Sequence, residues 1–304
     1  MTAGCIAVTG GTGFVGATLI RLAVERGHPV RALTRKSQQP TSGVTWVNGA
    51  LDQPASLAEL VGGCDAILHV AGVTNSVSRE GFIAGNVDGT RAIVEAAKTA
   101  GISRFIHVSS LSAREPDLSN YGWSKAEAER EVSASGLNWT MVRPPAIYGP
   151  GDTDHLDMFK AARFKLMPLP PRGRLSVVEV SDLARLLLAL VPASETAGRI
   201  FEADDGVEGG WTQSDYARAI GQAVGTAIIP LHLPGFAVRL GALIDRFLRG
   251  DKAKLTLDRA AYFCHPDWVI DPDNRPPPVL WTPQIETGSG LAATAEAYRK
   301  CGWL

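Results

Sequence analysis

The chain has 304 residues, of which 45% are hydrophobic and 20% are charged, and its formal net charge is −1. This composition is typical of a globular protein with a large core, and the length fits one large domain or two coupled ones. The near-neutral charge argues against nucleic acid as a partner. Four widely spaced cysteines without a C-x-x-C pair favour reduced thiols over disulfides or a zinc site. No secretory signal is evident, and the apolar run 186–191 is too short to span a bilayer, so we expect a cytoplasmic protein with no membrane partner.

Short apolar runs alternate with helical patterns through the first half of the chain. Six runs predict strands, at 5–9, 29–34, 44–49, 66–72, 104–110 and 138–144. Helical patterns lie between them, at 17–27, 57–63, 89–101 and from residue 120 onward. Strands that are separated by helical segments imply βαβ units, and hence a parallel sheet that is covered on both faces.

The pattern changes after residue 149. Residues 150–173 are rich in Pro, Gly, Arg and Lys, whereas 176–191 predict a strand or turn followed by a buried helix, and 198–205 predict a further strand. Helices are expected at 211–225, through most of 230–263 and near the end of the chain. The prolines of 271–283 indicate a loop, because proline lacks the amide that regular structure needs.

A glycine-rich turn joins the first strand to the first helix. The segment TGGTGFVG (9–16) places Gly10, Gly13 and Gly16 at the spacing G-x-x-G-x-x-G. Glycines permit a tight turn and the close approach of a pyrophosphate, whose negative charge is favoured by the exposed amides and the helix dipole. The context predicts a dinucleotide site, and a glycine-rich turn without a ligand is the alternative.

The end of the second strand is expected to meet the adenine ribose of such a dinucleotide. An acidic residue there would bind the 2′-hydroxyl and repel a 2′-phosphate. This chain has Thr34, Arg35 and Lys36 instead, and a cationic pair suits a 2′-phosphate. NADP(H) is therefore favoured as the cofactor, and NAD(H) stays an alternative. It also stays open that the basic pair lies on a solvated loop and binds no phosphate.

A tyrosine and a lysine stand four residues apart in YGWSK (121–125). On a helix such residues are neighbours, so Tyr121 and Lys125 project from one face. An ammonium beside a phenol lowers the pKa of the phenol, which makes the tyrosine a usable general acid or base. The strand before them ends in Ser109 and Ser110, at the edge where an open parallel sheet binds its ligand. A strand-end turn and an exposed helix start are the alternatives for these residues.

Six segments follow one another in order: TGGTGFVG, HVAG (69–72), NVDGT (86–90), VSS (108–110), YGWSK and RPPAIYGPGD (143–152). Together they resemble the short-chain dehydrogenase/reductase superfamily, in its extended or atypical branch of NAD-dependent epimerase/dehydratase-like proteins. The resemblance implies an α/β fold, a Rossmann-type doubly wound parallel sheet with a smaller, mostly helical C-terminal substrate region. Residues 1–149, with 176–203 returning to them, are then the NAD(P)-binding domain, and 150–175 and 204–304 the substrate-binding region.

The resemblance also implies residue roles. Tyr121 becomes the acid or base, Lys125 binds the nicotinamide ribose and lowers the tyrosine pKa, and Ser110 is the catalytic serine. The cofactor-binding residues implied by position are Gly10, Thr12, Gly13, Phe14, Val15, Gly16, Arg35, Lys36, Ala50, Leu51, Val70, Ala71, Gly72, Asn86, Ser109, Tyr121, Lys125, Pro144, Ala146 and Ile147. At Ala50 the chain departs from the superfamily pattern, which often has an adenine-binding Asp after the third strand.

Other polar residues form no metal constellation in the sequence. His69 and His107 lie in strands and are expected to be core residues. His155 is expected in a solvated loop, and a place in the substrate pocket is the alternative. The basic residues Arg163, Lys165, Arg172 and Arg174 predict either an anionic-substrate site or a solvated face. The amphipathic segment 236–250 is expected to pack within the substrate region rather than on a membrane surface.

These observations predict an NAD(P)-dependent oxidoreductase or epimerase/dehydratase that acts on a carbinol or carbonyl carbon of a small molecule, with a nucleotide sugar left open as the substrate. A non-catalytic NAD(P)-binding redox sensor or assembly subunit is the alternative. A homodimer also stays open, because extended members of the superfamily often pair through two helices of the sheet domain.

Overall fold

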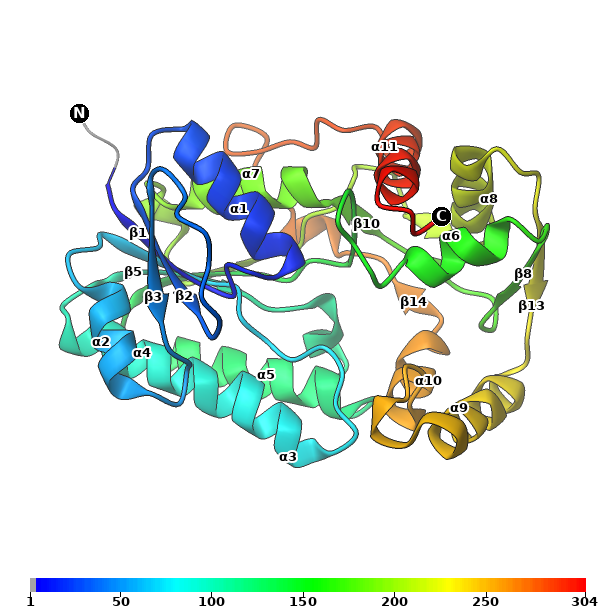
Figure 1. Cartoon of the computed structure of the whole chain (residues 1–304), viewed down its shortest axis with the longest axis horizontal. Coiled ribbons are helices and arrows are strands. Elements are labelled where there is room, and N and C mark those ends of the chain that lie inside the picture. Colours follow the sequence, from blue (N-terminus) through cyan, green and yellow to red (C-terminus); the bar gives the residue numbers. More distant parts are fainter. Residues whose placement is uncertain (1–3) are drawn as a thin grey trace. The chain divides into compact units, whose positions relative to one another are not determined.

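The computed structural model describes residues 4–304, which form two compact units (Figure 1). Unit 1 extends to Arg143 and includes Leu183–Phe201 and Pro276–Trp281. Unit 2 comprises Pro144–Asp182, Glu202–Arg275 and Thr282–Leu304.

Unit 1 is built on a sheet that has seven strands within residues 4–304. In spatial order they are β11 (Arg199–Phe201), β6 (Asn138–Val142), β5 (Arg104–Val108), β4 (Ala66–His69), β1 (Ile6–Thr9), β2 (Val30–Thr34) and β3 (Val44–Asn48). All neighbouring strands are parallel. The chain winds outward from β1 in both directions, so the doubly wound Rossmann-type sheet that the sequence predicts is confirmed.

Helices cover both faces of this sheet (Figure 1). On one face lie α1 (Phe14–Glu25) and α7 (Val180–Leu190), and on the other α2 (Pro54–Val61), α4 (Gly89–Thr99) and α5 (Asn120–Ser133). Shorter elements are α3 (Arg79–Phe82), the π-helix η1 (Ile83–Asp88) and the 3₁₀-helices η2 (Leu111–Arg114) and η3 (Ser194–Thr196). On the second face, Leu57, Ile93 and Val132 from the three helices are buried in one cluster with Ile67 and Phe105 of the strands. Burial of one apolar stripe per helix is the main reason why these segments are stable as helices.

Unit 2 consists mostly of helices with short strand pairs. Its helices are α6 (Leu156–Ala162), α8 (Gln213–Val224), α9 (Gly235–Arg249), α10 (Leu257–Phe263) and α11 (Thr287–Lys300), with 3₁₀-turns η4 (Gly250–Lys252) and η5 (Pro272–Asn274). The strands are β7 (Ala146–Tyr148) with β10 (Val177–Glu179), β8 (Leu166–Leu169) with β13 (Ile229–His232), and β9 (Arg174–Leu175) between β12 (Trp211–Thr212) and β14 (Asp267–Trp268). Its core includes Tyr148, Phe159, Tyr216, Leu291 and Tyr298.

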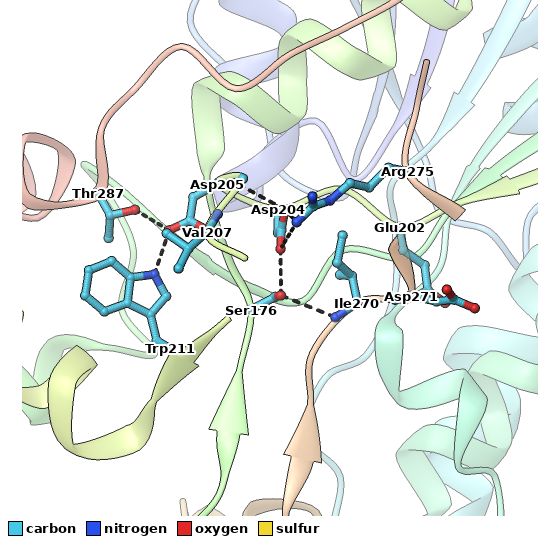
Figure 2. Close-up of polar contacts among 11 residues, drawn as sticks. Ser176, Glu202, Asp204, Asp205, Val207, Trp211, Ile270, Asp271, Arg275 and Thr287 are labelled. Atoms are coloured by element: carbon cyan, nitrogen blue, oxygen red, sulfur yellow. Dashed lines mark hydrogen bonds and ion pairs between the residues drawn. The ribbon is translucent and has the colours of Figure 1, made fainter. Parts of the chain in front are cut away.

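Two adjacent aspartates connect distant segments of unit 2. Figure 2 shows Ser176, Asp204 and Arg275 pointing toward one another. The carboxylate of Asp204, which is 2% exposed, accepts hydrogen bonds from Ser176 Oγ at 2.7 Å and from Arg275 Nη2 at 3.1 Å. Asp205 Oδ2 accepts from Trp211 Nε1 at 2.7 Å and from Thr287 Oγ1 at 2.5 Å. These bonds hold the segment after β11 against four other parts of the unit.

Two expectations about unit 2 are wrong. His155 does not lie in a solvated loop: its side chain is 11% exposed, and Nδ1 lies 2.6 Å from Oδ2 of the buried Asp152. The apolar stripe of 236–250 does not pack within the unit either. Helix α9 forms as predicted, but it packs through Ala242, a small residue, and exposes its large apolar side chains.

We expect Asp204→Ala to lower the free energy of unfolding of unit 2 by about 2–4 kcal/mol, because it leaves a buried hydroxyl and a guanidinium without their acceptor. Urea denaturation of the whole chain, followed by tryptophan fluorescence, measures the change. Asp273→Ala is the matched control, since Asp273 is exposed and only its backbone amide is hydrogen-bonded. Equal midpoints for the two variants would contradict this role of Asp204.

Candidate active site and cofactor site

The glycine turn after β1 has no room for side chains. Gly10 has φ +74°, and a Cβ there would lie 2.7 Å from the backbone nitrogen of Ala71. A Cβ on Gly16 would lie 2.1 Å from the carbonyl oxygen of Gly10. The amide of Gly13 donates to that same oxygen at 3.0 Å and closes the turn. Glycine is therefore required at positions 10 and 16, for backbone conformation and for close packing.

The start of α1 fits a pyrophosphate. Gly13 is the N-cap and supplies no side-chain acceptor, and the first turn, which begins with Phe14 and Val15, contains no acidic residue. Thr12 and Gly13 are exposed in front of it. The first amides of this helix thus point at an open surface and carry the positive end of the helix dipole, which favours a bound anion.

The turn after β2 carries the basic pair. Thr34 Oγ1 donates to the carbonyl of Lys36 at 2.6 Å and accepts from its amide at 3.2 Å, which fixes the backbone of the turn. Arg35 and Lys36 are exposed, and the segment 34–38 contains no carboxylate. Because β2 pairs directly with β1, this turn emerges at the same sheet edge as the glycine turn.

The segment after β3 is held by packing. Leu51 contacts the core cluster, and a Cβ added to Gly89 at the start of α4 would lie 2.7 Å from Leu51 Cδ1. The carbonyl of Ala50 accepts a hydrogen bond from Ser56 Oγ at 3.2 Å. Leu51 thus has a structural role, and its place among the cofactor-binding residues stays a prediction.

Asn86 connects the segment after β4 to α5. It lies in the π-helix η1, an irregular turn of a kind often found at functional sites. Its side chain accepts from the Val73 amide at 2.6 Å, and Nδ2 donates to the Val73 carbonyl at 3.0 Å and to Ser124 Oγ at 2.9 Å. These bonds hold Gly72 near α5, where a Cβ on Gly72 would be 3.7 Å from Lys125 Nζ. Three of the proposed site residues, Gly72, Asn86 and Lys125, therefore lie together, and Val70 and Ala71 lead into them.

Lys125 is a buried cation. It is 4% exposed, and Nζ donates to the carbonyl of Val108, the last residue of β5, at 2.9 Å. Burial lowers the pKa of Lys125 to about 8, and the nearby carboxylate of Glu129 opposes this shift. Tyr121 lies one turn before Lys125 on α5, half-buried, with its ring 6.0 Å from that of Phe82.

The two serines after β5 have different surroundings. Ser109 Oγ donates to Glu129 Oε1 at 2.5 Å, whereas Ser110 Oγ accepts from Ser112, from its amide at 3.2 Å and its hydroxyl at 2.9 Å. Helix α5 starts directly against this segment, since a Cβ on Gly122 would lie 2.7 Å from the Ser112 carbonyl. The packing brings the residue after Tyr121 next to the Ser110–Ser112 turn.

Sequence reasoning missed Glu129 and Arg143. Arg143 holds the Glu129 carboxylate with two parallel bonds, Nε to Oε1 at 2.8 Å and Nη2 to Oε2 at 2.6 Å. Glu129 looks like one of several surface charges in AEAERE, yet its side chain is only 9% exposed. The signal that could have identified it is its spacing, because Tyr121, Lys125 and Glu129 repeat every four residues and share a helix face.

Two stacked histidines lie in the adjoining strands. His69 bridges Thr9 Oγ1 at 2.7 Å and Thr90 Oγ1 at 2.9 Å, and its ring is 5.3 Å from that of His107. Burial, reinforced by the Lys125 charge, lowers the pKa of His69 to about 3 and that of His107 well below its usual value. Both are neutral core residues near neutral pH. Thr9 Oγ1 also accepts a hydrogen bond from the Ala71 amide at 3.3 Å. Through Thr9, His69 therefore helps to fix Ala71, which packs against Gly10.

The remaining sequence-predicted residues belong to unit 2. Pro144 is buried, and Ala146 and Ile147 pair with Val177 and Val178 in the β7–β10 pair. In the basic cluster, Arg174 donates to the carbonyls of Gly209 and Gly210 at 2.6 and 2.9 Å and so stabilises a loop. Among the residues that the structure describes, no group of three or more His, Cys, Asp or Glu side chains is arranged to hold a metal ion.

Residues 10–191 match the model of a protein family described as NAD(P)H-binding, which covers more than half of the chain. The chain belongs to this NAD(P)H-binding family. The ceramide reductase of Caulobacter vibrioides is 36% identical over 99% of the chain and 96% of its own length. The 2-alkyl-3-oxoalkanoate reductase of Stenotrophomonas maltophilia is 28% identical over 94% and 97%.

A solved structure has the same fold. The human epimerase family protein SDR39U1 with NADPH superposes with a TM-score of 0.74 at 20% identity, over 96% of this chain and 99% of that one. The resemblance to the extended short-chain dehydrogenase/reductase branch is confirmed, and the chain is an NAD(P)-dependent enzyme of the reductase and epimerase group. No helix within residues 4–304 has the length and apolar character needed to cross a bilayer.

We expect Glu129→Gln to lower the free energy of unfolding by about 3 kcal/mol, because it leaves the half-buried Arg143 without its carboxylate. It also lowers the pKa of Lys125 below about 8, since the Glu129 charge raises that pKa in the native protein. Urea denaturation measures the first change, and NMR of ¹³C-labelled lysine side chains across pH measures the second. Glu95→Gln, at an exposed ion pair, is the control, and a Lys125 titration unchanged by Glu129→Gln would contradict the coupling.

Proposed function

We propose that this enzyme is an NADPH-preferring reductase that converts a carbonyl group of a ceramide-type lipid to an alcohol. The observation that carries the proposal is the buried Lys125 ammonium, one helical turn from Tyr121 and bonded to the last carbonyl of β5, directly before the two serines. A cation kept inside the protein at this place needs a function, because burying it costs free energy.

Tyr121 is the proton donor in this proposal. Lys125 stabilises the phenolate that remains after the phenol gives its proton to the carbonyl oxygen of the substrate. When bound, NADPH supplies the hydride for the carbonyl carbon. Ser110 donates a hydrogen bond to the same substrate oxygen, a role for which Ser109 is less suited because its hydroxyl proton is held by Glu129.

The residues that would hold the cofactor fit a dinucleotide. The turn at Gly10–Gly16 and the open start of α1 would take the pyrophosphate, and Arg35 and Lys36 would take the 2′-phosphate. Thr12, Gly72, Asn86 and the residues after β3 complete the cofactor-binding set carried by the family motifs. Lys125 would contact the nicotinamide ribose.

The substrate class rests on the similarity to one reductase. The ceramide reductase of Caulobacter vibrioides matches this chain across both units at 36% identity, so the substrate-binding region is included in the match. An epimerase would use the same tyrosine and lysine but would return the hydride to its substrate. Net oxidation of NADPH therefore distinguishes the two reactions.

We expect Tyr121→Phe to lower the rate of NADPH-dependent reduction by about 10²–10⁴-fold, because the substrate oxygen loses its proton donor. The substrate in this assay is the ketone that gives a ceramide on reduction. NADPH binding, measured by fluorescence titration, stays within about twofold, since the phenol proton is not needed to hold the dinucleotide. Tyr262→Phe in α10 is the control. Near-normal turnover by Tyr121→Phe would contradict the role of Tyr121 as proton donor.

We expect the double variant Arg35→Ala/Lys36→Ala to raise the KM for NADPH by about 10–100-fold, because two charge-assisted contacts to the 2′-phosphate are lost. The KM for NADH, which lacks that phosphate, changes little. Arg21→Ala/Lys98→Ala removes the same charge from exposed ion pairs elsewhere on unit 1 and serves as the control. A parallel rise for both cofactors would refute the assignment.

A further inference from the structure

Helix α9 exposes a stripe of large apolar side chains. Phe236, Leu240, Leu243, Ile244, Phe247 and Leu248 are between 51% and 88% exposed. They stand at i, i+4, i+7, i+8, i+11 and i+12, which is one face of an α-helix. A soluble domain normally turns such a face toward its core, so its exposure indicates a surface that something else covers.

The opposite side of α9 packs against unit 2 with small and polar residues. Among the residues of α9, all of which the structure describes, Ala242 is the one that is buried. The carboxylate of Asp245 accepts the backbone amides of Lys254 and Leu255, both at 2.8 Å, and this fixes the helix to the segment that follows it. The helix is therefore held in place without use of its apolar stripe.

Arginines border the stripe. Arg239 and Arg246 are seven residues apart, so they lie on the same edge of the helix, and both are exposed. The segment 235–259 contains six basic and three acidic residues, a charge of +3 in a chain whose net charge is −1. The acidic residue within α9, Asp245, is already occupied by backbone amides and by Arg249 at 3.2 Å.

Neighbouring segments of unit 2 have the same character. Strand β13, which ends three residues before α9 begins, exposes Ile229 and Leu231. Its partner β8 follows Phe164, which is 81% exposed between the exposed Arg163 and Lys165. Exposed apolar side chains with adjacent cations are thus repeated outside the helix.

We propose that α9 docks on the surface of an anionic lipid bilayer. A helix with an apolar face and a basic border lies in the plane of the interface, with the apolar face at the boundary of headgroups and acyl chains. Arg239 and Arg246 then meet the lipid phosphates, where each basic residue adds to the attraction. At 15 residues the helix is too short to span a bilayer, which agrees with an in-plane position. The inference does not depend on the proposed lipid substrate.

The charges favour a bilayer over a second copy of the chain. Two copies that met through this stripe would bring their arginine borders close together. Asp245, the acidic residue of the same helix, is engaged with backbone amides and Arg249. Asp251, after the helix, lies 3.4 Å from Arg246 with both side chains exposed, and the segment 235–259 still has a net charge of +3. An anionic lipid surface supplies the missing negative charge.

Co-sedimentation of the purified protein with phosphatidylcholine vesicles, with and without phosphatidylglycerol, tests the proposal. The wild type is expected to pellet with the anionic vesicles, and less so at high salt, because salt screens the arginines. Phe236→Asp/Phe247→Asp abolishes pelleting with either vesicle. Arg239→Gln/Arg246→Gln weakens binding to the anionic vesicles by about tenfold or more and leaves binding to pure phosphatidylcholine unchanged.

Val279→Asp is the matched control, because Val279 is a 96% exposed apolar side chain of unit 1, and it keeps wild-type binding. Circular dichroism confirms that the variants fold. A wild type that stays in the supernatant overturns the proposal. A second result also overturns it: the wild type does not bind vesicles, sediments as a dimer, and becomes a monomer in the Phe247→Asp variant. The stripe would then be the contact surface for a second copy of the chain. Vesicle binding is measured without turnover, so failure here is separate from failure of the proposed reaction.

Discussion

The buried ammonium of Lys125 is the constraint that organises unit 1. A lone cation inside a protein is costly, so it must be surrounded by groups that compensate it. The Val108 carbonyl accepts a hydrogen bond from the ammonium, and Glu129 lies one helical turn further along α5. Glu129 is itself half of a bidentate pair with Arg143. The cation Lys125, the anion Glu129 and the cation Arg143 thus lie in a row from α5 to the end of β6, and each charge is partly compensated by its neighbour.

This charge arrangement also gives the two serines different hydrogen-bond partners and keeps the two histidines uncharged. Glu129 accepts a hydrogen bond from the hydroxyl of Ser109, and we therefore propose Ser110 as the serine that contacts a substrate. His69 and His107 lie near the same ammonium, and burial together with that charge keeps both rings neutral. A neutral imidazole can accept from or donate to threonine hydroxyls. His69 does this between Thr9 and Thr90, without adding a second cation beside Lys125.

The sequence predicts the sheet of unit 1 better than it predicts the polar contacts. Each central strand is buried on both faces, so it appears as a short apolar run, and β1, β4 and β5 lie within the predicted ranges. Glu129 was missed for the opposite reason. A buried glutamate and a surface glutamate look alike in a charged run. The spacing of Glu129 from Tyr121 and Lys125 places it on their helix face, but its partner Arg143 lies in another segment and is seen only in the fold. The same limit applies to His155, whose ring lies 6.0 Å from that of Tyr216, a residue distant in sequence.

Helix α9 shows a further limit of periodicity. An apolar stripe identifies a helix and one of its faces, but it does not say what lies against that face. In α4 the stripe faces the sheet, whereas α9 has comparable spacing and faces outward, because an aspartate and an alanine on its other side make the intramolecular contacts. Unit 1 buries the charge of Lys125, and unit 2 exposes the apolar stripe of α9. Each arrangement lowers the stability of the isolated chain. Such departures from the rules of folding are expected at places where the protein binds something that the chain itself does not provide.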